Sequence, residues 1–179
     1  MIVIKKLLPA VFFVILALLF TGCGSFSQPA SPSFELRNAP CDISYDGKEY
    51  RASVTNSLGG IMSVSFSEPP SMQGLVYTFS PGGCKISFGD LSFSSETVRL
   101  DSRALPRLLC DIIRNASTEG ALSYSPTDTP DESAAVFSGE IYGMRYTITT
   151  DKATGIPRMI SSAGLGADIV FEPISESSS

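Results

Sequence analysis

The chain has 179 residues, of which 13 are basic and 18 acidic, and it contains no histidine. Its net charge of -5 disfavours binding to nucleic acids, whose backbones are polyanions. The lack of histidine removes the commonest general base and the commonest metal ligand. No motif of catalytic spacing compensates for this, so the composition argues against an enzyme, a nucleic-acid-binding protein and a zinc protein. No cofactor is predicted.

The first 22 residues have the layout of an export signal. Lys5 and Lys6 form a short basic region, the run from Leu7 to Phe20 is apolar, and two small residues follow it. The apolar run is shorter than the roughly 20 residues that a transmembrane helix requires. We therefore expect residues 1–22 to be removed as a signal peptide.

The four residues Phe20-Thr21-Gly22-Cys23 resemble the lipobox of bacterial lipoproteins. The resemblance implies that Cys23 carries a diacylglyceryl group and begins the mature chain, anchored at the extracytoplasmic face of a cell membrane. Two acyl chains hold a protein stably at a bilayer, whereas one does so only marginally. The alternative is an ordinary signal peptide followed by an incidental cysteine.

The composition divides the rest of the chain into three parts. Residues 24–33, GSFSQPASPS, are too poor in apolar groups to offset the entropy of ordering them, so residues 23–33 are predicted to form the lipidated cysteine and a flexible tether. Residues 34–173 are sufficient for a single domain with its own core. The polar residues 174–179 are predicted to be a disordered tail.

Apolar residues alternate with polar ones through most of this domain, which is typical of half-buried antiparallel strands. The first set of apolar faces is Cys41-Ile43-Tyr45, Tyr50-Ala52-Val54, Met62-Val64-Phe66, Leu75-Tyr77-Phe79 and Cys84-Ile86-Phe88. Their turns are expected at Asp46-Gly47, Gly59-Gly60 and Pro81-Gly82-Gly83. A second set of strands is expected over residues 134–140, 141–151, 156–162 and 167–172.

One helix is predicted between the two sets, near residues 105–116. Its apolar residues recur at helical spacing and form one stripe: Leu105, Leu108, Leu109, Ile112 and Ile113. Pro106 suits the first turn, where its missing N–H would be unpaired in any case. The polar segment from Ser117 to Glu132 is expected to be a long loop. The fold class is therefore mainly β with one helix (α+β), and the apolar stripe is expected to pack on the sheet.

Three cysteines remain once Cys23 is set aside, and an odd number cannot form a closed set of disulfides. Cys41 and Cys84 each begin an alternating apolar pattern, so their side chains are expected on the buried face. The pattern favours buried free thiols, and a bridge between Cys41 and Cys84 is the alternative.

The order of the parts resembles the LolA/LolB-like superfamily of outer-membrane lipoprotein carriers and related glycolipid-carrying lipoproteins. The segments that carry the resemblance are GGIMSVSFSEPPSMQGLVYTFS, DKATGIPRMI and ADIVFEP. The resemblance implies a curved antiparallel sheet, or half-barrel, with a helix packed on its concave face and a lipid or acyl chain held between them. The residues that would line such a pocket are Met62, Phe66, Tyr77, Phe79, Leu109 and Ile113.

Two functions follow from the sequence. The first is a membrane-anchored, non-catalytic module that binds a lipid, an acyl chain or another apolar ligand. The second is a tethered structural or protein-interaction lipoprotein whose core is fully packed and holds no ligand. In both, the lipid on Cys23 makes the membrane a partner. The sequence identifies no protein partner for either function.

Overall fold

The computed structural model describes residues 29–57, 59–95, 100–126, 128–129 and 131–173. The predicted signal peptide, Cys23 and the predicted tail therefore lie outside the described residues. In the described part, eleven strands form one sheet, which is accompanied by one helix, α2. None of the helices described there is long and apolar enough to cross a membrane. The strands are β1 (Leu36–Tyr45), β2 (Lys48–Asn56), β3 (Met62–Glu68), β4 (Leu75–Ser80), β5 (Gly83–Phe88), β6 (Leu91–Ser95), β7 (Ser123–Tyr124), β8 (Ala134–Ile141), β9 (Met144–Asp151), β10 (Pro157–Ser162) and β11 (Ala167–Phe171).

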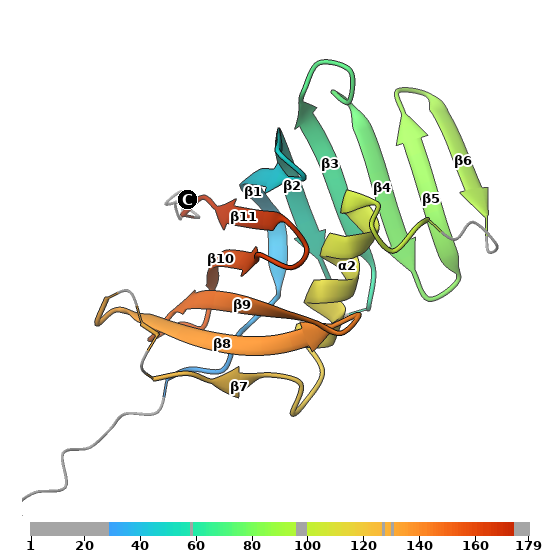
Figure 1. The fold of residues 1–179 in the computed structure, drawn as a ribbon. Helices are drawn as coiled ribbons and strands as arrows, with labels where there is room; N and C mark the ends of the chain where they lie inside the picture. Colours follow the sequence, from blue (N-terminus) through green and yellow to red (C-terminus); the bar gives the residue numbers. More distant parts are fainter. Residues whose placement is uncertain (1–28, 58, 96–99, 127, 130, 174–179) are drawn as a thin grey trace, which may run out of the picture.

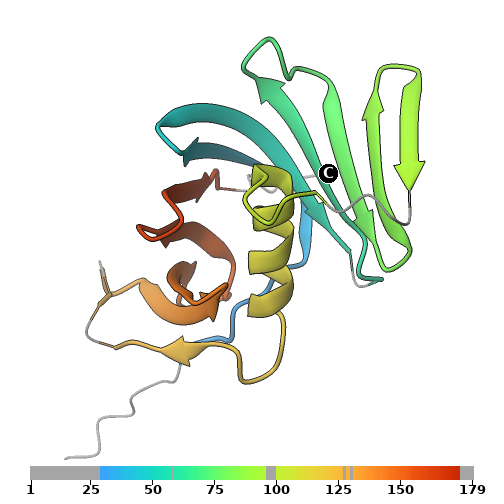
Figure 2. The same cartoon turned by 45° about the vertical axis from the view of Figure 1, so that its right-hand side comes forward.

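The sheet consists of two meanders joined edge to edge. Its strand order is β6-β5-β4-β3-β2-β1-β11-β10-β9-β8-β7, and each neighbouring pair is antiparallel. β1 pairs with β11 from Cys41 opposite Phe171 to Tyr45 opposite Ala167. The edge strands β6 and β7 are not paired with each other, so the sheet is strongly curved but not closed into a barrel (Figures 1 and 2). The expected fold class is confirmed.

The helix α2 (Leu105–Ala116) lies in the hollow of the curved sheet, as Figure 2 shows. The chain leaves the sheet at the β6 edge and re-enters it at the β7 edge, so α2 is the connection between the two edges. All five residues of the predicted apolar stripe are buried, and Pro106, Cys110 and Ala116 are buried with them. Except for Pro106, these side chains form one core cluster with the inward-facing residues of the sheet.

Contacts from the middle and from the C-terminal end of the helix join α2 to β8 and β9. In the middle of the helix, Asp111 accepts hydrogen bonds from Arg107 Nε at 2.6 Å and from the Tyr142 hydroxyl. Near its C-terminus, the buried Tyr146 donates from its hydroxyl to Asn115 Oδ1 at 2.5 Å. A Cβ on Gly139 would overlap the ring of Tyr146, so only glycine leaves room for this ring. These contacts hold α2 against β8 and β9, while Arg114 Nη2 donates to the Gly60 carbonyl, just before β3, at 3.4 Å.

Two parts of the strand prediction differ from the structure. The strand expected over residues 141–151 begins three residues later, at Met144, because Ile141 still belongs to β8 and the chain turns at Tyr142 and Gly143, whose φ values are 54° and 74°. Tyrosine seldom adopts a positive φ, so the sequence carried only half of the usual signal for this turn. In addition, β6 was not predicted, and the loop expected from Ser117 to Glu132 contains the short strand β7.

A pair of substitutions tests the register of β3. Phe66 is buried among core residues, whereas Ser65 is only half-buried, on the opposite face. We expect Phe66→Ala to lower the free energy of unfolding by about 3 to 5 kcal/mol, through lost transfer energy and the cavity it leaves. Ser65→Ala should change it by less than about 0.5 kcal/mol. Chemical denaturation measures both, and equal losses would mean that the register is wrong.

Candidate functional site

The strands β4, β5 and β6 carry two rows of apolar side chains on one face. Tyr77 lies opposite Ile86, which lies opposite Phe93, and this makes the first row. Residues directly opposite each other in antiparallel strands project on the same side of a sheet. Leu75, Phe88 and Leu91 are paired in the same way and form the second row. We call these six residues the wing face: Leu75, Tyr77, Ile86, Phe88, Leu91 and Phe93.

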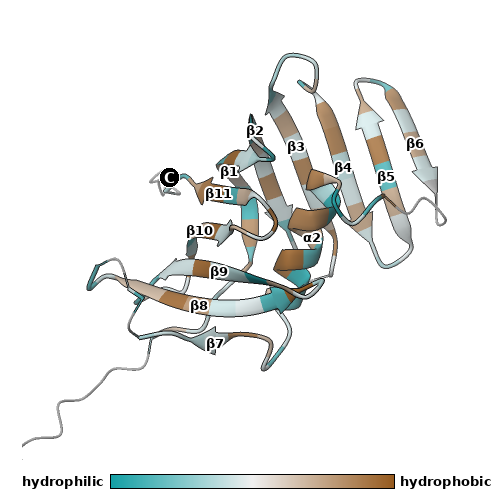
Figure 3. Ribbon diagram, viewed as in Figure 1, coloured by the Kyte–Doolittle hydropathy of each residue, from teal (hydrophilic) through white to brown (hydrophobic). Residues whose placement is uncertain are grey.

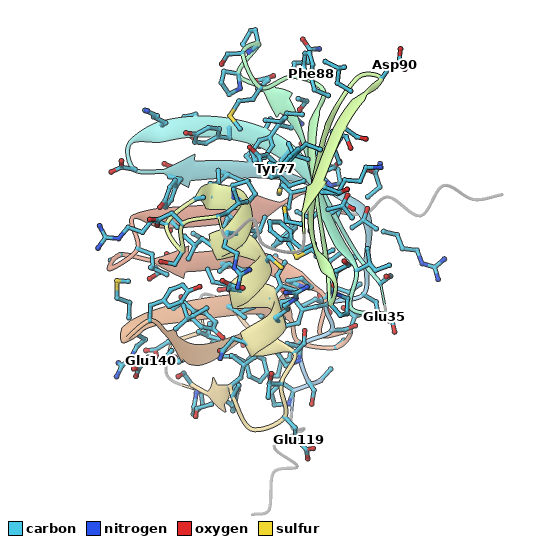
Figure 4. The ribbon with its side chains drawn as sticks, turned by 90° about the vertical axis from the view of Figure 1, so that its right-hand side faces the viewer. Glu35, Tyr77, Phe88, Asp90, Glu119 and Glu140 are labelled. Carbon is cyan, nitrogen blue, oxygen red and sulfur yellow. The ribbon has the colours of Figure 1, made fainter. Side chains whose placement is uncertain are left out.

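The wing face is continuous with the protein core. Phe79 and Cys84 occupy the next same-face positions of β4 and β5, and both are buried in the core cluster. Tyr77 also meets the buried Phe66 edge to face, with ring centroids 6.1 Å apart. Figure 4 shows Tyr77 and Phe88 on the side of the strands that faces α2. The wing face is therefore the outer continuation of the concave, helix-facing surface.

Burial decreases steadily outward along this surface. Phe79 is 2% exposed, whereas Phe88 is 55%, Phe93 58% and Leu91 74% exposed. Three large apolar side chains from two adjacent strands are therefore open to solvent together. Monomeric soluble proteins seldom leave contiguous apolar patches uncovered, and such patches usually mark a binding surface.

The opposite face of the same strands is polar except for Val76 on β4. Its other residues are Thr78 on β4, Lys85 and Ser87 on β5, and Ser92 and Ser94 on β6. The Thr78 hydroxyl hydrogen-bonds to that of Ser63 on β3 at 3.1 Å. Figure 3 shows the resulting alternation of apolar and polar residues along β3, β4 and β5. Antiparallel sheets commonly pack their apolar face against other groups and expose their polar face to water. The alternation therefore indicates that the wing face is the side of these strands that makes contacts.

No carboxylate or amine belongs to the wing face, and its single hydroxyl stays neutral. The pKa of Tyr77 is raised, first by burial and then by the neighbouring Cys84 thiol. Burial also raises the pKa of Cys84, although the nearby Arg107 opposes this. Arg107 thus lies toward the inner border of the wing face, where Asp111 already binds it. The surface is chemically suited to hydrocarbon.

The six pocket residues predicted from the sequence do not lie together in an open site. Met62, Phe66, Phe79, Leu109 and Ile113 are each 2% exposed or less and belong to the packed core. Tyr77 alone reaches the wing face. Phe88, Leu91 and Phe93 were missed as site residues. Phe88 follows the predicted alternation of β5, and the alternation in Leu91-Ser92-Phe93-Ser94 was a signal for β6 that was not used.

Three surface hollows lie elsewhere on the described part of the protein. One of about 420 Å³ is lined by residues that include Phe34, Asn56 and Arg114, and one of about 470 Å³ by residues that include Ile156 and Val170. The third, of about 500 Å³, lies at the turn between β4 and β5. None of the six predicted pocket residues lines any of the three.

The cysteines in the described residues are free and buried, namely Cys41, Cys84 and Cys110. The interpretation as buried thiols is therefore confirmed, and the alternative bridge between Cys41 and Cys84 is absent from the structure. Burial raises the pKa of Cys41 to about 12 and that of Cys110 to about 11, so both stay protonated and unreactive at neutral pH. Among the residues that the structure describes, no three His, Cys, Asp or Glu side chains are grouped to hold a metal.

Comparison with known proteins gives a coarse likeness of fold. No protein-family model matches the chain, and no curated protein matches it. An uncharacterized conserved protein from Thermus thermophilus aligns with a TM-score of 0.43 and 15% identity, over 75% of this chain and 76% of that one. The LolA superfamily protein NE2245 from Nitrosomonas europaea aligns with a TM-score of 0.39 and 12% identity, over 82% and 86%. Likenesses at this level carry no conclusion about the family of this chain or about the wing face.

Substitutions that separate the wing face from the core test this description. Phe93→Ser should change the free energy of unfolding by less than about 1 kcal/mol, because more than half of this side chain is already in water. Leu109→Ala should cost about 2 to 5 kcal/mol, because Leu109 is fully packed. Thermal unfolding of the two variants measures the difference. A loss from Phe93→Ser as large as that from Leu109→Ala would show that the wing face is part of the core.

Proposed function

We propose that the protein is a membrane-anchored extracytoplasmic lipoprotein, without catalytic activity, that binds an acyl chain on the wing face. The observation that carries the proposal is the exposure of Phe88, Leu91 and Phe93 on a surface continuous with the core. The lipobox-like segment ending at Cys23 supports the anchor and its place at the extracytoplasmic face of the cell membrane.

An acyl chain is the occupant that the chemistry of this face favours. The six side chains offer no ion pair and only one hydroxyl, so they supply contact area rather than polar recognition. Each methylene group removed from water contributes about 0.8 kcal/mol, so a chain of several methylenes binds measurably without a polar partner.

A second function is supported by the burial of five of the predicted pocket residues. Met62, Phe66, Phe79, Leu109 and Ile113 pack as an ordinary core, which suits a tethered structural or protein-interaction lipoprotein without an internal ligand. In that case the wing face would contact another protein. The two functions share the anchor and differ in what covers Phe88, Leu91 and Phe93, so a lipid-binding measurement separates them.

Replacing Cys23 tests the anchor. Cys23→Ala removes the thiol to which the diacylglyceryl group would be attached, so the variant should remain an uncut precursor or be cut by another peptidase, and should carry no acyl group. Metabolic labelling with a radioactive fatty acid measures this against the wild-type chain. Label in the alanine variant equal to that in the wild type would contradict the proposed anchor.

Paired double variants of β6 test the ligand. In the chain from Gly24 onward, Leu91→Ser with Phe93→Ser should weaken the binding of a fluorescent fatty acid about tenfold or more. Each lost apolar contact is worth on the order of 1.5 kcal/mol, and 1.4 kcal/mol corresponds to a factor of ten.

The matched control changes the polar face of the same strand. Ser92→Ala with Ser94→Ala should leave the affinity for the probe unchanged. If both double variants bind the probe like the wild-type sequence, the acyl chain does not lie on the wing face. If no variant and no wild-type protein binds it, the protein-interaction function replaces the proposed one.

A further inference from the structure

The residues that precede the sheet are held against the domain by backbone hydrogen bonds. Ala30 N–H donates to the Lys152 carbonyl at 3.0 Å, and Ser33 N–H donates to the Gly155 carbonyl at 2.9 Å. The next residue, Phe34, is buried, and its carbonyl accepts a hydrogen bond from Asn56 Nδ2 at 2.8 Å. We call residues 30–33 the strap. The described end of the predicted tether is therefore fixed to the turn between β9 and β10.

This turn is organised around Asp151. One carboxylate oxygen of Asp151 accepts from Thr154 N–H at 2.9 Å and from the Thr154 hydroxyl at 3.0 Å, and the other accepts from Arg158 at 2.6 Å. These bonds from Thr154 and Arg158 lower the pKa of Asp151 to about 2, so the carboxylate is ionised at neutral pH. The turn is thus a preformed surface on which the strap lies.

Gly155 is the point of closest approach between the turn and the strap. It has a φ of 73°, and a Cβ built on it would overlap the Ser31 carbonyl. Both features require glycine at this position. A residue that serves only the turn would need the positive φ alone, so the contact with Ser31 shows that the strap and the turn are packed as one unit.

The strap and the wing face lie at opposite ends of the molecule. Figures 1 and 2 both show the start of the described chain next to the β8–β10 region, far from β5 and β6. Figure 4 shows Phe88 and Asp90 at the top of the molecule and Glu35, two residues after the strap, in its lower half. Seven strand-to-strand steps separate β10 from β6 in the sheet, which is about 34 Å along its surface at ~4.8 Å per step.

The proposed anchor can reach only a short distance from the strap. Six residues, 24–29, separate Cys23 from Ala30. Fully extended, the seven steps from Cys23 to Ala30 span at most about 25 Å, at ~3.3 to 3.6 Å per step. The strap end of the domain must therefore stay close to the bilayer that holds the lipid on Cys23.

We infer that the strap orients the anchored domain, so that the turn between β9 and β10 faces the anchoring bilayer and the wing face opens away from it. This inference rests on the proposed anchor and deepens the proposed function. An acyl chain then reaches Phe88, Leu91 and Phe93 from the aqueous side as a lipid monomer, and not by direct insertion of the wing into the anchoring membrane.

Energy transfer from single tryptophans to the bilayer tests the orientation. The sequence contains no tryptophan, so each introduced residue reports alone. The first reporter is Ile156→Trp, which adjoins Gly155 at an exposed position, and the second is Ser94→Trp on the polar face of β6. Both are made in the full lipidated chain carrying Leu91→Ser and Phe93→Ser, so that lipid bound to the wing face cannot contribute.

The acceptor is a phospholipid with a dansyl headgroup, in vesicles of phosphatidylcholine that hold the protein through its lipid. We expect the Ile156→Trp donor to lose more fluorescence to the dansyl group than the Ser94→Trp donor does. Equal losses, or a larger loss from Ser94→Trp, would overturn the inferred orientation. A chain that does not stay with the vesicles would overturn the anchor and this inference together, while probe binding by the chain from Gly24 onward is measured independently of both.

Gly155→Ala, added to each reporter, tests the part played by the strap. Its Cβ displaces Ser31, so the difference in fluorescence loss between the two reporters should shrink. Circular dichroism establishes whether the domain is still folded. If a folded Gly155→Ala protein keeps the full difference, the strap does not orient the domain. Gly164→Ala serves as the control, since the nearest contact of its added Cβ is the flexible Met144 side chain at 3.4 Å, away from the strap.

Discussion

The size of the helix relative to the sheet is the constraint from which the other features follow. A helix of 12 residues is about 18 Å long, whereas eleven strands at ~4.8 Å extend for roughly 50 Å around the curve. One helix therefore cannot cover the whole concave face, and some of the apolar surface must remain open or meet another molecule. The contacts of α2 with Tyr142 and Tyr146 hold the helix beside β8 and β9. The residues left exposed are those farthest from the core on β5 and β6, namely Phe88, Leu91 and Phe93.

Chain connectivity gives the same result. Each meander can be formed by local hairpins, and the two meet only at the pairing of β1 with β11. The connection from the β6 edge to the β7 edge must then cross the hollow of the sheet, and α2 lies within that crossing. The apolar face is thus filled at its centre, where α2 passes, and is bare at the β6 edge. A binding surface arises there without a dedicated pocket.

Most of the fold could be predicted from the sequence, because its elements have strong periodicity. The helix over residues 105–116 and most of the strands were read from periods of 3.6 and 2, and the positive φ at Asp46 and Gly47 matches a recognisable turn. The start of β9 was placed three residues too early, because tyrosine is not a usual turn residue and Tyr142 gave no signal for the turn. The site was harder, since alternation tells which face a residue occupies but not whether another element covers that face. Met62 and Phe88 have the same pattern, yet one is in the core and the other is in water.

The central claim is that the wing face holds an acyl chain, and the most direct measurement is mass spectrometry of an organic extract of the protein. The chain from Gly24 onward, purified without detergent, carries no covalent lipid, so any lipid in the extract was bound to the folded domain. The account predicts a lipid with an acyl chain in the wild-type extract. It predicts the loss of this lipid from the Phe88→Asp variant, which places a charge between Leu75 and Leu91 in the second row of the wing face. A wild-type protein free of lipid, or equal lipid in both extracts, would contradict it.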